Sequence, residues 1–198
     1  MKLYHNPASP YTRKVMVLAH ETGLVDRIEL MPIKVWEETD RIRSDNPLGK
    51  IPTLINDDGQ AVYDSTVICA YLDTLHGGAK MIPEGDGRWP VENLHALAQG
   101  MTDAALTLRA DVMRGLDKQA DFYADRMRAT IKSACDEAER RLSEIEGKVN
   151  LGTVALAVGL AYLDFRFPEN AWRDGHPGLA AWYEAFAERP SMKATPPA

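Results

Sequence analysis

The sequence has little that would suit a membrane, a nucleic acid or a secretory route. No apolar run approaches the roughly 18 residues that a membrane-spanning helix needs, and residues 1–7 lack the apolar core of a signal peptide. Acidic side chains outnumber basic ones, 29 to 23, whereas a general nucleic-acid binder would carry a basic face. These absences predict a cytoplasmic protein that binds neither membranes nor nucleic acids.

Cysteine is also scarce, with only Cys69 and Cys135 in 198 residues. Both fall on apolar faces of predicted helices, so we expect two small buried side chains. A disulfide between them is disfavoured in a reducing compartment. The five histidines stand singly, and no metal-ligand spacing occurs. The sequence therefore predicts no metal site and no cysteine nucleophile.

The first part of the chain alternates strands and helices. Strands are predicted at 2–5, 28–35, 53–55 and 61–63, and helices at 9–23, 36–44 and 64–75. The first crossover predicts a parallel pair of strands, and the Asp58-Gly59 turn predicts an antiparallel hairpin. Pro32 places the second strand at an edge or a bulge. This order of elements is that of a thioredoxin-like α/β domain.

The rest of the chain is predicted to be helical. Apolar residues recur at spacings of three and four over 94–112, 123–145 and 176–188, as in amphipathic helices. Residues 151–165 are apolar nearly all round, which indicates a central buried helix. The tail after Pro190 is predicted to be irregular. We therefore predict a thioredoxin-like domain at 1–76, a Gly- and Pro-rich linker at 77–88 and an all-α domain at 89–198.

The most informative motif is Asn-Pro-Leu-Gly-Lys-Ile-Pro-Thr-Leu at 46–54, followed by Asp64-Ser65. The first segment enters a strand through Pro52, and the second begins a helix. A small extended peptide could pair with the backbone beside Pro52, as one strand pairs with another. The helix start at Asp64-Ser65 could take its carboxylate.

Together with Ser9-Pro10 and Tyr-Leu-Asp-Phe-Arg at 162–166, these motifs resemble those of the glutathione transferases, over essentially the whole chain. Residues 150–153 and the final Pro-Pro-Ala look most like a bacterial, YibF-like subgroup. One departure concerns the buried helix. The family starts this helix with Ser or Thr and places Asp three residues later. Here Thr153 is followed by Leu156, so we expect this reciprocal cap to be missing and the helix to be capped differently.

The resemblance implies an enzyme of detoxification. Such a transferase binds glutathione as a co-substrate, stabilises its thiolate and lets it attack a small electrophile, without a metal or a bound cofactor. A homodimer is also implied. Two alternatives share the fold: a glutathione-binding regulatory protein with little catalysis, and a glutathione-dependent isomerase or peroxidase that would use the same thiolate.

Ser9 is expected to cap a helix, because Ser is favoured at the N-cap and Pro at the next position. By matching position in the family, Ser9 is also the catalytic candidate that contacts the glutathione sulfur, where a helix start lowers the pKa of a thiol. Tyr4 and Tyr11 are rivals, although Tyr4 is expected in the strand core. The absence of cysteine at Ala8 and Ser9 argues against the disulfide-exchange branch of the family.

The resemblance assigns further glutathione contacts. A cis bond before Pro52 would turn the amide and carbonyl of Ile51 toward the cysteinyl backbone of glutathione. Ser65 would take the γ-glutamyl carboxylate, Asp64 would face the ammonium, and Lys50 would attract the glycyl carboxylate.

The resemblance also implies three roles farther along the chain. Asp103 would reach the glutathione ammonium of the other subunit. Tyr11 and Leu108 would line the electrophile pocket. The cationic Arg13 and Lys14, in contrast, are expected on a solvated face.

Overall fold

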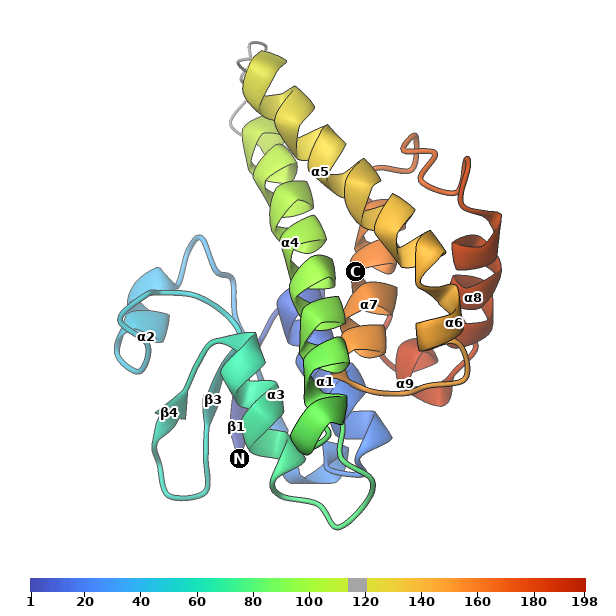
Figure 1. Ribbon diagram of the computed structural model, residues 1–198. Coiled ribbons are helices and arrows are strands. Elements are labelled where there is room, and N and C mark those ends of the chain that lie inside the picture. Colours follow the sequence, from blue (N-terminus) through green and yellow to red (C-terminus); the bar gives the residue numbers. More distant parts are fainter. Residues whose placement is uncertain (114–120) are drawn as a thin grey trace. The chain divides into compact units, whose positions relative to one another are not determined.

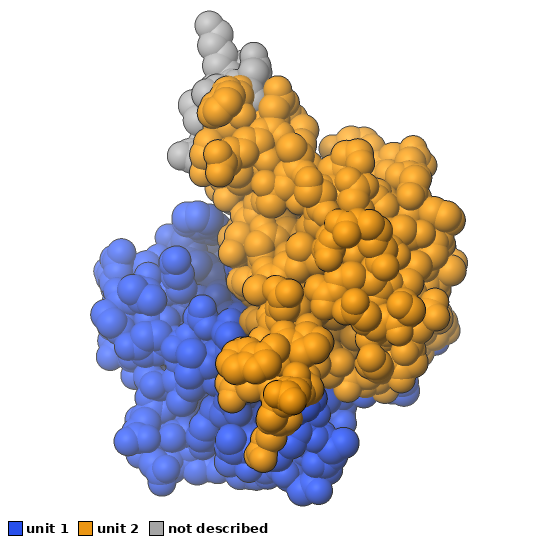
Figure 2. Space-filling view, viewed as in Figure 1, with its two compact units in different colours: residues 1–83, 190–198 blue, residues 84–189 orange. Residues whose placement is uncertain are grey.

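The computed structural model describes residues 1–113 and 121–198 (Figure 1). Their contacts divide the chain into two compact units, residues 1–83 with 190–198 and residues 84–189 (Figure 2). The predicted domain bounds stay a prediction. The structure differs from them at the end of the chain, where residues 190–198 group with the first unit.

A four-stranded sheet forms the centre of the first unit. Its order is β2-β1-β3-β4, with β1 parallel to β2 and antiparallel to β3, and with β3 antiparallel to β4. The predicted parallel pair and hairpin are therefore confirmed, and Pro32 lies in an edge strand as expected. The elements of this unit are β1 (Lys2–His5), α1 (Pro10–Glu21), β2 (Glu29–Pro32), α2 (Thr39–Arg43), β3 (Thr53–Ile55), β4 (Ala61–Val62), α3 (Ser65–Asp73) and α9 (Pro190–Lys193), with a 3-10 turn at Val25–Arg27.

The expectation that Arg13 and Lys14 are solvated is wrong, because they are only 8% and 3% exposed. For Arg13 the reason is the end of the chain, which we predicted to be irregular. Pro190 instead begins α9, and α9 packs against α1. One guanidinium nitrogen of Arg13, Nη2, donates to the carbonyl of Met192, 3.3 Å away. The two residues are 179 positions apart in the sequence, so a local sequence pattern could not predict this contact.

The second unit is helical, as predicted. Its elements are a 3-10 turn at Gly85–Gly87, α4 (Arg88–Met113), α5 (Asp121–Arg140), α6 (Leu142–Ile145), α7 (Leu151–Arg166) and α8 (Pro177–Ala187). Every residue of α7 from Leu151 to Leu163 is buried, which confirms the central buried helix. The most extensive packing in this unit joins α7 to α4, which also packs against α5. No helix in the described part of the chain is both long and apolar enough to cross a membrane.

The expectation that α7 is capped differently from the family pattern is confirmed. Asn150 is the N-cap, and its Oδ1 accepts from the backbone N–H of Thr153 at 3.0 Å. The hydroxyl of Thr153 in turn accepts from the backbone N–H of Asn150 at 2.9 Å. The box is therefore complete, but it begins three residues earlier than the family pattern suggested.

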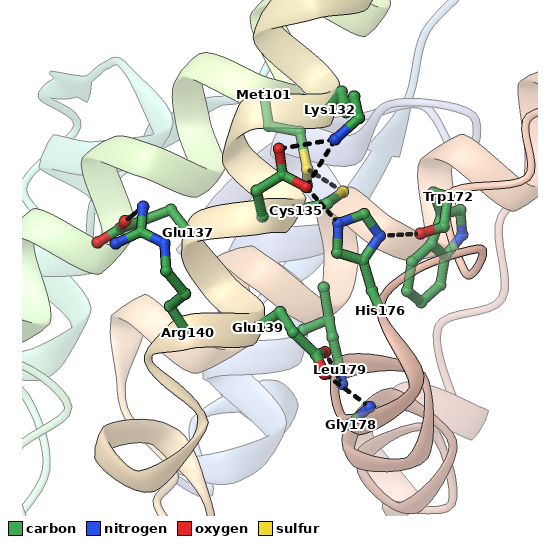
Figure 3. A network of polar contacts seen from close by, with 11 residues as sticks. Met101, Lys132, Cys135, Glu137, Glu139, Arg140, Trp172, His176, Gly178 and Leu179 are labelled. Atoms are coloured by element: carbon green, nitrogen blue, oxygen red, sulfur yellow. Dashed lines mark hydrogen bonds and ion pairs between the residues drawn. The ribbon is translucent and has the colours of Figure 1, made fainter.

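The start of α8 is capped by side chains of α5 (Figure 3). The carboxylate of Glu139 accepts from the backbone N–H groups of Gly178 at 3.0 Å and Leu179 at 2.6 Å. The buried ring of His176 lies between the carbonyl of Trp172, 2.6 Å from Nδ1, and a carboxylate oxygen of Asp136, 2.8 Å from Nε2. A negative charge at a helix N-terminus is stabilising, so α5 holds α8 in place.

Two helical glycines of this unit should respond in opposite directions to alanine. A Cβ on Gly152 would meet the carbonyl oxygen of Val91 at 2.8 Å, whereas a Cβ on Gly100 would meet nothing within 4 Å. Gly100→Ala should therefore raise the free energy of unfolding by about 0.5–1 kcal/mol through helix propensity. Gly152→Ala should lower it, because backbone atoms would have to separate. Urea unfolding of both variants measures this, and a shift of the same sign in both would contradict the packing described for α7.

Candidate functional site

Ser9 lies at the junction of β1 and α1, where it caps the helix as predicted. Its backbone is extended, and its Oγ accepts from the N–H of Thr12 at 3.3 Å. Pro10 is the first helical residue. The Ser9 side chain is half-buried. Its hydroxyl is held at the helix start by this long hydrogen bond. The cap is confirmed, and its role toward a thiol stays a prediction.

Tyr4 is a core residue, as expected. Its side chain is 4% exposed, and its hydroxyl donates to Asp45 at 2.6 Å. Burial raises the pKa of Tyr4, and the hydrogen bond to the Asp45 carboxylate raises it further. A hydroxyl committed to Asp45 is a poor partner for a thiolate. Tyr11, the other rival, is half-buried near the start of α1.

The segment before β3 has the backbone form that we expected. The Ile51–Pro52 peptide bond is cis. The side chain of Ile51 packs against a buried cluster of Tyr4, Ile33 and Ile42, and Lys50 is exposed. Neither the N–H nor the C=O of Ile51 forms a hydrogen bond within residues 1–113 and 121–198. Both groups are therefore available to an extended ligand.

Asp64 caps α3, and Ser65 is its first residue. The Oδ1 atom of Asp64 accepts from the N–H of Thr66 at 2.9 Å and from that of Val67 at 3.4 Å. Ser65 is 2% exposed. The Tyr63–Asp64 peptide bond is also cis.

The sheet brings these segments to one of its ends. Tyr4 is opposite Thr53 in the antiparallel β1–β3 pair, so the end of β1 lies beside the start of β3. Leu54 is opposite Val62 in the β3–β4 pair, so the end of β4 lies there too. Three loops consequently lie at the same end of the sheet. They carry Ser9, then Lys50 with Ile51 and Pro52, and then Asp64 with Ser65.

The two other predicted site residues belong to α4, in the second unit. Asp103 is exposed, and its carboxylate accepts from the side-chain amide of Gln99 at 3.1 Å. Leu108 is buried. Their predicted roles, in the partner's site and in the electrophile pocket, stay predictions.

Sequence reasoning assigned no role to two asparagines that shape the loops of the site. In each, the side-chain Oδ1 accepts from the backbone two residues later, Asn6 from Ala8 at 2.9 Å and Asn46 from Leu48 at 3.0 Å. Asn6 Nδ2 also donates to the carbonyl of Ile33 at 3.2 Å. Both asparagines precede a proline, and Asn-Pro favours turn initiation. That dipeptide was the signal that could have identified them.

The cysteines are buried and free, as predicted. Burial raises the pKa of Cys69 to about 11 and that of Cys135 to about 12. Among the residues that the structure describes, no group of His, Cys, Asp or Glu could hold a metal ion.

Comparison with known proteins agrees with this geometry. Family models described as the N-terminal and the C-terminal domain of glutathione S-transferase match residues 8–75 and 121–185. The uncharacterized GST-like protein YibF of Escherichia coli K12 is 31% identical, over 100% of this chain and 98% of that protein. The chain belongs to the glutathione S-transferase family. The predicted resemblance to YibF and the predicted fold class, a thioredoxin-like α/β domain followed by an all-α domain, are confirmed.

Solved structures of other bacterial family members are also similar. A glutathione transferase family member from Pseudomonas fluorescens Pf-5, with bound glutathione, is 43% identical, with a TM-score of 0.96 over 100% of this chain and 98% of that one. The glutathione transferase family member of Pf-5 with bound S-(propanoic acid)-glutathione is also 43% identical, with a TM-score of 0.92 over 100% of both chains. A glutathione S-transferase from Methylobacillus flagellatus KT, with GSH bound, is 32% identical, with a TM-score of 0.87 over 100% of this chain and 99% of that one.

Neither thiol of this glutathione S-transferase family member should react in the folded state. Because burial disfavours both thiolates, Ellman's reagent at pH 8 should label the native protein far more slowly than the urea-unfolded protein. The double variant Cys69→Ala, Cys135→Ala should match the wild type in glutathione binding and in any glutathione-dependent turnover, with some loss of stability. Loss of turnover in a variant that is folded and still binds glutathione would instead indicate a cysteine mechanism.

Proposed function

We propose that the protein is a glutathione transferase, which binds glutathione, stabilises its thiolate and transfers it to a small electrophile. The observation that carries this proposal is the meeting of three loops at one end of the sheet. They supply a helix start with a hydroxyl at Ser9, a backbone at Ile51 that is unpaired within the described residues, and a second helix start at Asp64-Ser65. Relatives 43% and 32% identical hold glutathione, which supports the same ligand here.

The peptide backbone of glutathione would be recognised by the loop before β3. The N–H and C=O of Ile51 are the groups of a strand edge, and the cysteinyl residue of glutathione would pair with both. The exposed ammonium of Lys50 would attract the glycyl carboxylate. Pairing of this kind extends a sheet by one residue and fixes the position of the thiol.

The γ-glutamyl end would be held at the start of α3. The hydroxyl and amide of Ser65 would donate to the carboxylate, and the positive end of the helix dipole would favour it. Only Oδ1 of Asp64 is used by the cap, so its other oxygen would face the ammonium. The cap of the helix and the ligand site would thus be the same structure.

Catalysis would come from the start of α1. A hydrogen bond from Ser9 and the dipole of the helix would stabilise the thiolate and lower the pKa of the bound thiol. The proton would leave to solvent, and the sulfur electron pair would form the new bond to the electrophilic carbon. In a substitution, the leaving group would depart from that carbon with its bonding electron pair. In an addition, the π electrons of a double bond would move to the neighbouring atom, which would take up a proton from solvent. S-(propanoic acid)-glutathione, bound in a relative, has a substituted sulfur of the kind that such a transfer produces.

The remaining parts of the proposal follow the family. The protein would be a homodimer in which Asp103 reaches the glutathione ammonium of the other subunit. Tyr11 and Leu108 would contact the electrophile. Glutathione would be a co-substrate in the cytoplasm, and the transfer would serve detoxification without a bound cofactor.

The experiment that tests the function is binding to immobilised glutathione, followed by turnover with a panel of electrophiles. A transferase should bind glutathione and consume at least one electrophile in proportion to enzyme. Binding without turnover of any electrophile would favour a regulatory protein of the same fold. Isomerisation or peroxide reduction without conjugate formation would favour the other alternative.

Glutathione should raise the thermal midpoint of unfolding. A ligand at 100 times its dissociation constant adds roughly 2.7 kcal/mol of stability by mass action. Ser65→Ala should reduce this shift more than Lys50→Ala does, because it removes a donor to the γ-glutamyl carboxylate at the helix start. Scanning fluorimetry across millimolar glutathione measures both effects. No shift at any concentration would rule out the binding site.

Ser9 can be tested by separating its two roles. Ser9→Ala removes the N-cap, at about 0.5–2 kcal/mol, whereas Ser9→Gly removes the same hydroxyl at a capping cost of only a few tenths of a kcal/mol. Both variants should still bind glutathione, and in both the thiolate absorbance should appear at higher pH than in the wild type. Each unit of pKa corresponds to about 1.36 kcal/mol.

An unchanged thiolate titration in Ser9→Gly would show that Ser9 is only a cap. Tyr11 or the backbone amides of α1 would then have to stabilise the sulfur, since the hydroxyl of Tyr4 is bonded to Asp45.

A further inference from the structure

Asn46 and Thr53 form a buried polar pair inside the loop that carries Ile51. Asn46 is 1% exposed and Thr53 is fully buried. Asn46 Nδ2 donates to the Thr53 hydroxyl oxygen at 2.9 Å and to the carbonyl oxygen of Lys50 at 3.1 Å. The Thr53 hydroxyl donates to the same carbonyl oxygen at 2.8 Å. Two interior side chains therefore hold one carbonyl group.

This pair sets the direction of the Lys50–Ile51 peptide. The cis bonds of residues 1–113 and 121–198 are Ile51–Pro52 and Tyr63–Asp64, so the Lys50–Ile51 bond is trans. In a planar trans peptide, the C=O and the N–H point in opposite directions. Because the C=O points at the buried pair, the N–H of Ile51 points away from it. That N–H is the donor described above as unpaired within the described chain.

We propose that Asn46 and Thr53 are positioning residues that aim the Ile51 amide at the cysteinyl backbone of glutathione, an inference that rests on the proposed glutathione site. Neither side chain would touch the ligand, since both act through the carbonyl of Lys50. Without them the Lys50–Ile51 peptide could rotate, and the donor would turn away. Buried polar groups persist only when they are hydrogen-bonded. The Nδ2 group of Asn46 and the hydroxyl of Thr53 meet that condition through each other and through the Lys50 carbonyl.

Asn56 offers a matched control in the same unit. It is 8% exposed, and its Oδ1 also accepts from the backbone two residues later, Asp58, at 3.0 Å. It shapes the β3–β4 turn, which carries no proposed ligand contact. Its Nδ2 has only a 3.3 Å contact, with the side chain of Gln60. Substitution by Asp at either position keeps the Oδ1 acceptor and removes the Nδ2 donor.

The test is calorimetric titration of the full-length protein with glutathione. Asn46→Asp should raise the Kd about two- to tenfold, the change expected when one hydrogen bond to the ligand is lost. Asn56→Asp should change it less than about twofold. Equal weakening in the two variants would overturn the positioning role and leave Asn46 as a structural residue.

Thr53 supplies the second, independent arm. Thr53→Ser keeps the hydroxyl, and Thr53→Val keeps the branched shape but loses the donor. The inference predicts a near wild-type Kd for serine and a weaker one for valine. A merely structural role predicts the reverse order, because valine suits the start of β3 better than serine does. Serine binding no better than valine would overturn the inference.

The two proposals fail in distinguishable ways. A wild-type protein that does not bind glutathione would refute the glutathione site itself, and the positioning role with it. A wild-type protein that binds, alongside Asn46→Asp and Thr53→Val variants that bind equally well, would refute the positioning role alone.

Discussion

The antiparallel pairing of β1 with β3 is the constraint on which the rest of the first unit depends. Its register sets Tyr4 opposite Thr53, so the chain leaves β1 where it enters β3. The β3–β4 hairpin then returns the chain to that same end of the sheet. A shift of one residue would turn every side chain of the strand to the other face. It would also displace the loop of Ser9 relative to the loop of Ile51 by about 3.3 Å, the rise of one strand residue.

The helices α1 and α3 begin at this end of the sheet. Their first turns serve both the fold and, in the proposed function, the ligand. An N-terminus leaves backbone N–H groups without partners inside the helix, and it favours negative charge. Ser9 and Asp64 each satisfy part of that demand with one oxygen atom. In the proposed function, the sulfur and the γ-glutamyl carboxylate of glutathione satisfy more of it. Stability of the fold and affinity for the ligand would then share one physical source.

Buried or half-buried polar side chains play a comparable part in both units. Asn46 and Thr53 hold a carbonyl of the first unit, and Glu139 holds two amides at the start of α8 in the second. In each case a side chain satisfies backbone groups that would otherwise be left unpaired. Because an unpaired buried polar group costs about 1–3 kcal/mol, such contacts constrain the shape of a loop. The helix α7 differs, because its residues from Leu151 to Leu163 are buried and nearly all apolar. The polar side-chain contacts at its start form the Asn150–Thr153 capping box.

The sequence by itself determined the features that arise within a few residues of one another. Ser9-Pro10 begins a helix, Asp58-Gly59 closes a hairpin, and the apolar run of residues 151–163 forms a buried helix. The motifs at 46–54 and 64–65 also indicated the family. Each of these signals acts through local backbone geometry or through the period of apolar side chains.

Only the tertiary structure decided which distant groups meet. The burial of Arg13 depends on Met192, and the cap of α8 depends on Glu139, some 40 residues earlier. The direction of the Ile51 N–H depends on the hydrogen bonds that Asn46 and Thr53 donate to the carbonyl of Lys50. Directional hydrogen bonds of this kind have no periodic trace in the sequence, because they need two segments to be placed before either partner can be identified.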